Sequence, residues 1–501
     1  MKKPYIYFVF AISILFAINS TKAQYTDISY FMRNTPTSFK MNPAMTPTAK
    51  FYINFPTSSI NMNFSTSGFA YKDIITRRND DSLQIDLDKF HNKLTDNNYF
   101  KLETNTEIFG FGFQVENKNY VSFGLDFNID ANFNFSKGLF DILLYGTESA
   151  DKKSQILDGK LLSLNAYIAP SISFTRIIDE KLTLGLRVKM PLGIANITTE
   201  KSELSLDFND DKITAMSNFM IKTSIIAGSL NFTGIRSVTE DNNNDNSNNF
   251  DQLDNSSDII KQALKNKGLA FDFGGTYKLN KSMLVSLSVQ DLGFIHWASN
   301  VTNIQSKNPN NSYTFNGLGS VDYDGDISDQ LNDIGDSLIN SLDLETVKGK
   351  SYTKMLPTKI YAGFTWNFTK TQYLNALYKT AIGSNYFDQY LSIYYSLQLE
   401  RYLNISLGNT FAFENKWNSI SAINPSLAFN FNLYCVNLYF GGSLRSSCNL
   451  SSITGLNIFV GMNLAFGYND YWKEPTEGEN GDSQMPTVPE TNTEQPKSDS
   501  K

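Results

Sequence analysis

The feature that most constrains this chain is an alternation of apolar and polar residues, sustained over runs longer than most strands of soluble sheets. From Val121 to Phe135 every second residue is apolar, and the residues between them are Asn, Asp, Gly or Ser. A similar run extends from Leu456 to Tyr468. Such runs predict long strands with one apolar and one polar face, so we expect an all-β chain.

Two classes of all-β protein share this alternation, the large secreted β-sandwich or β-propeller and the membrane barrel. Three observations favour a transmembrane antiparallel β-barrel. The runs reach the roughly 9–11 residues that a tilted strand needs to cross a bilayer. The connections between them alternate between short and long, and the last run carries Phe466 and Tyr468 on its apolar face. Short periplasmic turns, longer external loops and aromatic girdles are typical of outer-membrane barrels.

A periplasmic end at Tyr468 gives a consistent topology. Tight turns then fall inside, near residues 117–119, 179–181, 280–281, 369–371, 401–402 and 432–433, and long connections fall outside, at 136–160, 197–268, 294–357 and 443–454. We expect about 14 strands if residues 203–235 form a hairpin projecting from the membrane, and about 16 if they cross it. Short helices are expected in the outer loops, one of them at 257–265.

The two ends of the chain differ from the rest. Residues 1–23 have the parts of a secretory signal, with Lys2 and Lys3 ahead of an apolar stretch that is too short to serve comfortably as a membrane anchor. Residues 473–501 contain almost no apolar side chains, which predicts a disordered acidic tail. The barrel is thereby placed at 51–472, and we expect it in the outer membrane of a Gram-negative bacterium.

Composition excludes several other classes. The formal net charge is −7, whereas nucleic-acid binding needs clustered Lys and Arg, so no nucleic-acid partner is expected. The chain has two cysteines, too few for a disulfide scaffold. Cys435 is expected in a strand and Cys448 in the following loop, about 33 Å apart at the rise of a strand, so both are expected to be unpaired.

The sequence offers little support for catalysis, a cofactor or a metal. It lacks the motifs of serine hydrolases, zinc peptidases and phosphate-binding loops. Of the two histidines, His91 lies in a polar segment, and His296 with Trp297 is expected at a membrane interface. Asp322, Asp324 and Asp326 suggest calcium, but the Gly and Glu positions of an EF-hand loop are not matched. We therefore predict no enzyme, no catalytic or metal-binding residues and no cofactor.

Four short motifs carry a resemblance to known proteins. They are Met41–Pro47, Gly268–Asn280, Ser288–Trp297 and Leu356–Gly363. With them, the chain resembles a largely uncharacterised Bacteroidota family of outer-membrane β-barrels that is FadL-like (fatty-acid-transporter-like) in layout and distantly similar to barrel components of the type IX secretion system. The resemblance implies an N-terminal hatch inside the barrel, formed by the segment 24–50 and containing Asn42, Pro43 and Ala44.

Three functional hypotheses follow. The first is a conduit for a hydrophobic or amphipathic small-molecule ligand, gated by the hatch. The second is a non-transporting barrel that docks a protein partner in surface assembly or secretion. The third, an outer-membrane enzyme, would need His91 or His296 close to a nucleophile or an acid. Outer-membrane lipid is an expected partner in each case.

One further segment bears on the conduit hypothesis. Apolar residues at helical spacing predict a helix that could serve as a lid over the barrel mouth, or that could simply pack loops together; they are Ile327, Leu331, Ile334 and Leu338.

Overall fold

The computed structural model describes residues 27–32, 35–55, 58–67, 69–77, 83–138, 140, 157–158, 161–209, 212–226, 236–237, 256–307, 344–383, 387–399, 402–413, 420–445 and 452–468. The expected signal at 1–23, the lid helix at Ile327–Leu338, the aspartates at 322–326, Cys448 and the tail at 473–501 lie outside these ranges. No helix in the described part of the chain is long and apolar enough to cross a membrane.

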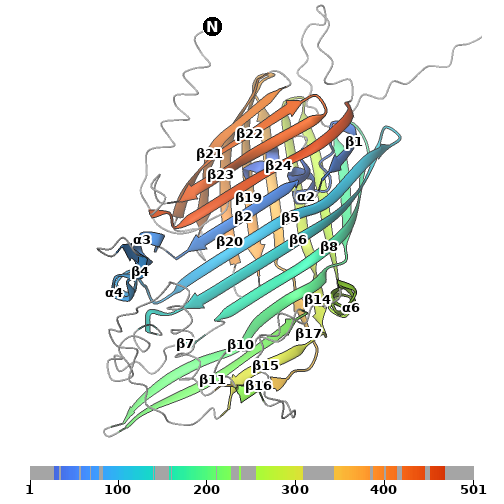
Figure 1. The fold of residues 1–501 in the computed structure, drawn as a ribbon. Helices are drawn as coiled ribbons and strands as arrows, with labels where there is room; N and C mark the ends of the chain where they lie inside the picture. The colour runs from blue at the N-terminus through green and yellow to red at the C-terminus, as the bar shows by residue number, and fades with distance from the viewer. Residues whose placement is uncertain are drawn as a thin grey trace, which may run out of the picture.

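The chain folds into a closed antiparallel β-barrel whose wall has 14 strands (Figure 1). In chain order the wall consists of β1 (Ala49–Asn54) continued by β2 (Ser59–Thr66), β5 (Asn98–Val115), β6 (Asn119–Phe135), β8 (Leu162–Ile177), β9 (Leu182–Lys189) continued by β10 (Leu192–Asn209), β13 (Gly268–Asn280), β14 (Met283–Trp297), β17 (Tyr352–Met355) continued by β18 (Thr358–Asn367), β19 (Gln372–Ile382), β20 (Phe387–Leu399), β21 (Leu403–Phe413), β22 (Ile420–Leu433), β23 (Val436–Arg445) and β24 (Gly455–Tyr468).

The first and last wall strands close the barrel. β24 pairs with β1 from Ala49 opposite Tyr468 and with β2 from Ser59 opposite Gly461. β1 and β2 both pair with β5 on their other side. The two elements therefore act as one interrupted strand, and the closed ring leaves the wall without a free edge.

The segment 203–235 does not add two further crossings. From Ala195 to Asn209, β10 pairs with β11 (Lys212–Ile225), which pairs with β15 (Val301–Ser306), and β15 pairs with β16 (Leu344–Lys348). Figure 1 shows this extension projecting beyond the rest of the barrel, and the expectation of 14 strands is confirmed.

Tight turns join the strands at the end of the barrel where β1 starts and β24 ends. Described turns include 116–118, 178–181, 281–282 and 434–435. At the last of these, Tyr434 has a φ of 56°, so a left-handed residue closes the hairpin two residues later than the sequence indicated. Cys435, expected in a strand, lies in this turn as an exposed free thiol.

One of these turns is stabilised by its own side chain. The carboxylate of Asp179 accepts hydrogen bonds from the backbone N–H groups of Lys181 (2.7 Å) and Leu182 (2.8 Å). These two donors hold the pKa of Asp179 below its usual value.

Short elements lie in the connections toward the opposite end of the barrel. The connection between β2 and β5 forms α3 (Tyr71–Ile74), β3 (Ile75–Arg77), β4 (Leu83–Ile85) and α4 (Leu87–His91). Phe69 contacts the ring of Phe90 in α4 and that of Phe100 on β5, so it joins the connection to the wall. The helix expected near 257–265 is present as α6 (Ser256–Ala263). Short helices thus occur in the outer connections, as expected.

Burial along the wall is the reverse of that in a soluble sheet. On β24, Ile458 and Val460 each expose 48% of their surface, whereas Asn457 and Asn463 on the opposite face expose 2% and 1%. The same exposure of large apolar side chains recurs on β8, β9, β13 and β14, for example at Ile172, Leu184 and Leu287. An outward apolar band with a polar interior is the arrangement that a bilayer stabilises, so the predicted facing of the strands is confirmed.

A β-bulge in β14 changes which residues face the lumen. Gln290 and Asp291 together oppose the single residue Asp272 of β13, and Asp291 has a left-handed φ of 57°. The alternation therefore resumes in the opposite phase beyond the bulge. As a result Trp297 points inward and is fully buried. The expectation that Trp297 lies with His296 at a membrane interface is wrong for the tryptophan.

The outward facing of Val460 can be tested directly. Val460→Arg should destabilise the barrel by about 2–4 kcal/mol if the side chain lies near the bilayer midplane. Urea titration of the full chain in lipid vesicles measures this difference, with Val460→Leu as the control that keeps the site apolar. An unchanged unfolding midpoint for Val460→Arg would contradict the facing.

Candidate functional site

Residues 27–32 and 35–48, here called the luminal segment, occupy the interior of the barrel instead of forming part of its wall. The segment contains the 3₁₀ turn η1 (Ile28–Phe31) and the helix α2 (Pro36–Met41), which begins with a proline at a position that needs no backbone donor. A turn at Pro43–Ala44 leads on toward β1. Figure 1 shows α2 enclosed by the wall strands near β1 and β24.

Inward-facing aromatic residues of the wall receive the apolar side chains of the luminal segment. Three contact groups form: Ile28 and Met32 with Tyr394, Ala428, Tyr439 and Phe459; Tyr30 and Met41 with Tyr361 and Leu377; and Phe39 with Ala49, Tyr52, Tyr120 and Ala465. The rings of Tyr30 and Tyr361 stack at 5.6 Å. The segment is therefore packed on several sides of the lumen, like a small core.

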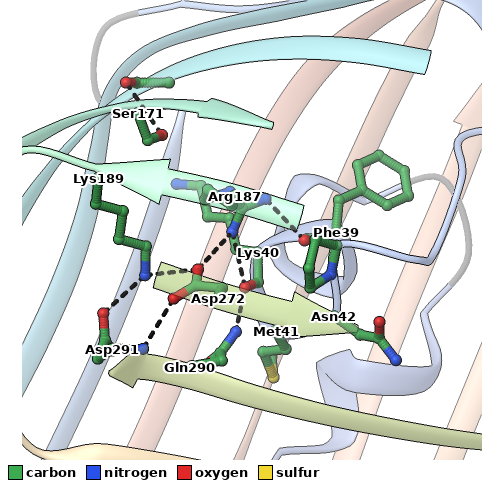
Figure 2. A network of polar contacts seen from close by, with 12 residues as sticks. Phe39, Lys40, Met41, Asn42, Ser171, Arg187, Lys189, Asp272, Gln290 and Asp291 are labelled. Atoms are coloured by element: carbon green, nitrogen blue, oxygen red, sulfur yellow. Dashed lines mark hydrogen bonds and ion pairs between the residues drawn. The ribbon is translucent and has the colours of Figure 1, made fainter. Parts of the chain in front are cut away.

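Polar side chains of β9 and β14 bind the backbone carbonyl groups at the end of α2 (Figure 2). Arg187 donates to the carbonyl oxygens of Phe39 (2.8 Å) and Lys40 (2.9 Å). Gln290 also donates to the carbonyl oxygen of Lys40, and Ser288 donates to the carbonyl oxygen of Met41 at 2.7 Å. These carbonyl groups lack partners within the helix, so the wall supplies them.

The arginine is itself held by a buried charge network. Asp272 on β13 is fully buried and lies 3.4 Å from Arg187 and 2.8 Å from Lys189. Lys189 also pairs with Asp291 at 2.7 Å, and the backbone N–H of Asp291 donates to Asp272. The bulge is what turns Asp291 inward and completes the network. Removing one member of such a group leaves a buried charge uncompensated.

Two further ion pairs connect the luminal segment to other parts of the wall. Lys40 pairs with Asp126 on β6 and with Glu107 on β5, the latter at 3.3 Å. At the start of the segment Asp27 pairs with Lys379 on β19 at 2.8 Å. The segment is thus fixed at its start and near the end of α2 by charges from different strands.

The three residues expected in a hatch lie together at the centre of these contacts. The side chain of Asn42 is fully buried, donates to the Tyr30 hydroxyl (3.1 Å) and accepts from the backbone N–H of Ala44 (2.9 Å). Thr175 on β8 donates to the carbonyl oxygen of Pro43. Asn42 thus shapes the turn, and Thr175 attaches it to the wall.

Two wall glycines allow this close approach. A Cβ atom at Gly185 on β9 would lie 2.1 Å from the carbonyl oxygen of Pro43 and 2.5 Å from the backbone nitrogen of Ala44. A Cβ atom at Gly274 on β13 would lie 2.2 Å from Oδ1 of Asn42. At both positions a larger residue would displace the turn.

A cavity of about 80 Å³ lies beside the luminal segment. The segment contributes Tyr30, Phe31, Met32, Ser38, Phe39, Ala44, Met45, Thr46 and Thr48, and the wall contributes Thr276, Leu284, Thr365, Tyr373, Asn375, Ser396 and Asn404. The wall residues come from strands β13 to β21, several of them close to the tight turns. The cavity therefore lies toward the tight-turn end and combines an apolar side with a mainly polar one.

The other residues singled out from the sequence do not converge. His91 ends α4 in the outer connection, while His296 faces outward on β14 with Nδ1 3.0 Å from the hydroxyl of Thr353. Among the described residues, no group of His, Cys, Asp and Glu could hold a metal ion.

The residues that hold the luminal segment were not predicted from the sequence. Arg187 and Lys189 alternate with Leu186 and Val188, so their inward facing could have been deduced from the pattern. Because this chain has few charged residues, charges at inward positions were the signal that could have identified these residues. Their partners, Asp272 and Asp291, depend on the bulge, and period two does not reveal it.

Comparison with known proteins gives one family match. The sequence profile described as "Family of unknown function (DUF5723)" matches residues 43–442. No curated protein matches the chain in sequence.

Three solved structures are similar to this chain over most of its length. The toluene transporter TbuX of Ralstonia pickettii is 10% identical, with a TM-score of 0.42 over 86% of this chain and 94% of that chain. The toluene transporter TodX of Pseudomonas putida is 9% identical, with a TM-score of 0.43 over 87% and 95%. A FadL homologue of Pseudomonas aeruginosa is 10% identical, with a TM-score of 0.42 over 90% and 100%.

The docking of the luminal segment can be tested at Gly185. Gly185→Ala places a methyl group against the backbone of Pro43 and Ala44, so the turn should leave its site and trypsin should cleave after Lys40 at least several times faster. Gly275→Ala is the matched control, because its Cβ atom would meet only Leu184, at 3.6 Å. Equal cleavage of the two variants would show that the segment does not dock at Gly185.

Proposed function

We propose that this chain, which belongs to the family of unknown function DUF5723, is a conduit for hydrophobic or amphipathic small molecules and is gated by its N-terminal segment. The single observation that carries the proposal is that the luminal segment lies inside a closed barrel and also forms one side of a cavity. In this state the barrel is closed, and passage requires the segment to move.

The contacts of the segment suit a gate better than a permanent core. Among the described residues its backbone continues into the wall only at β1, and elsewhere it is held by apolar packing, side-chain hydrogen bonds and ion pairs. Such contacts can be exchanged for water when the segment moves, at a net cost of about 0.5–1.5 kcal/mol for each neutral hydrogen bond. We propose that Asn42, Pro43 and Ala44 form the part of the hatch that seals against β8, β9 and β13.

The cavity suits an amphipathic ligand. Phe31, Met32 and Phe39 offer an apolar surface, and Thr365 and Asn375 on the wall offer hydroxyl and amide groups. A small apolar molecule with one polar end could contact both sides. The proposal includes no catalytic step and no cofactor.

The placement of the whole chain follows from the same proposal. The outward apolar band suits an outer membrane, with residues 1–23 as the export signal, 24–50 as the hatch segment, 51–472 as the barrel and 473–501 as an acidic tail. The tight turns would then face the periplasm. A lid helix containing Ile327, Leu331, Ile334 and Leu338 would belong to the opposite face.

A second function is favoured by one specific observation. The sheet formed by β10, β11, β15 and β16 extends beyond the wall and offers a surface that a channel does not need. In this alternative the barrel is a docking component of a surface assembly, and the luminal segment is only a plug.

Native mass spectrometry of the full chain, extracted from its own membrane in mild detergent, separates the two functions. A copurified amphiphile of small mass on a single barrel is the result expected for a conduit. A stoichiometric protein partner on a barrel without an amphiphile would contradict the conduit and favour docking.

A variant of the cavity tests where the ligand binds. Thr276 on β13 is buried and lines the cavity, so Thr276→Phe should fill the space and reduce retention of the amphiphile by tenfold or more. Tyr277→Phe, next to it but facing outward, should retain the amphiphile like the unmodified protein. Equal retention in both variants would place the ligand elsewhere.

A further inference from the structure

The helix α6 lies outside the barrel with an apolar face exposed. Ile260 and Leu264, one helical turn apart, both have exposed side chains. A helix on a soluble protein would turn such a face toward a core. Figure 1 shows α6 beside the outer end of the wall, near β14 and β17.

A buried asparagine fixes this helix to the wall. The side-chain oxygen of Asn266 accepts from the backbone N–H groups of Ala298 and Ser299, both at 2.8 Å, and its amide nitrogen lies 3.2 Å from the hydroxyl of Ser224. Its backbone oxygen accepts from Gly193 at 2.7 Å. The end of α6 is therefore attached to three segments, and its exposed face has a defined position.

The wall beside α6 carries a row of exposed apolar side chains. Leu269 on β13 pairs with Phe294 on β14, which pairs with Met355 on β17. All three are exposed on the outer surface of the wall. This row continues the apolar band that faces the bilayer.

A polar row lies immediately beyond the apolar one. Lys267, which directly precedes β13, His296 on β14 and Thr353 on β17 each lie two residues further toward the outer end, about 7 Å away at the rise of a strand. His296 donates its backbone N–H to the carbonyl oxygen of Lys267 at 3.0 Å. The outer surface thus changes from apolar to polar between the two rows, which marks the level of the lipid headgroups.

Two exposed lysines occupy that level. Lys267 belongs to the polar row, and Lys265 precedes it at the end of α6; both are exposed. Among the described residues, no acidic side chain forms an ion pair with either lysine. Lysine ammonium groups at the headgroup level attract anionic phosphates, while their alkyl chains rest on apolar surface.

We propose that this surface binds an outer-leaflet lipid with a phosphorylated headgroup. The phosphate contacts Lys265 and Lys267, and the acyl chains lie along Leu269, Phe294 and Met355. Charge complementarity and continuity with the bilayer-facing band both favour a lipid over a protein occupant. The site is independent of the luminal segment and of whatever the barrel conducts.

Native mass spectrometry of the purified full chain in a nonionic detergent tests this site, with bisphosphorylated lipid A as the probe. Lys265→Gln combined with Lys267→Gln should lower the apparent affinity tenfold or more, and the corresponding double Arg variant should retain binding. Lys118→Gln with Lys181→Gln makes the same charge change in exposed turns at the other end and should bind like the unmodified protein.

Two results would overturn the proposal. One is equal binding of lipid A by the double Gln variant and the unmodified protein. The other is equal binding of dephosphorylated lipid A, since apolar contact alone would then account for retention. The electrophoretic mobility of the unheated, folded barrel confirms that each variant has assembled.

Discussion

Backbone hydrogen bonding in a solvent without water is the constraint on which the rest of this structure depends. Hydrocarbon offers no partner for an exposed N–H or C=O group, so a sheet that crosses it has to close on itself. β24 meets this requirement by pairing with β1 and β2 along its length. The extension of β10, β11, β15 and β16 departs from the ring only beyond the band of exposed apolar residues, where water can satisfy its edges.

Closure creates an interior that has to be filled. The inward residues of the wall include Asp272, Arg187 and Lys189, whose charges are costly to bury without partners. These side chains form ion pairs with one another, and Arg187 also donates hydrogen bonds to the carbonyl groups that have no partner within α2. The luminal segment therefore lies where the buried charges of the wall and the open carbonyl groups of α2 provide each other with hydrogen-bond partners.

Much of the wall could be predicted from the sequence, because its facing follows from a local period of two. The run from Leu456 to Phe466 predicted the outward and inward faces of β24 correctly. The bulge at Asp291 could not be found in this way, since no glycine or proline marks it, and Trp297 was misplaced as a consequence. The contact between Arg187 and Phe39 joins residues 148 positions apart, and only the closed fold brings them together.

Hydrogen–deuterium exchange of the full chain in lipid nanodiscs tests most directly whether the luminal segment is held inside the barrel. The backbone N–H groups of Ser38, Asn42 and Met45 donate within the segment and are shielded by the wall. Peptides covering residues 35–47 should therefore exchange as slowly as peptides from β13 and β14. Exchange at the rate of an unprotected peptide would show that the segment does not reside in the lumen, and the gated conduit would have to be abandoned.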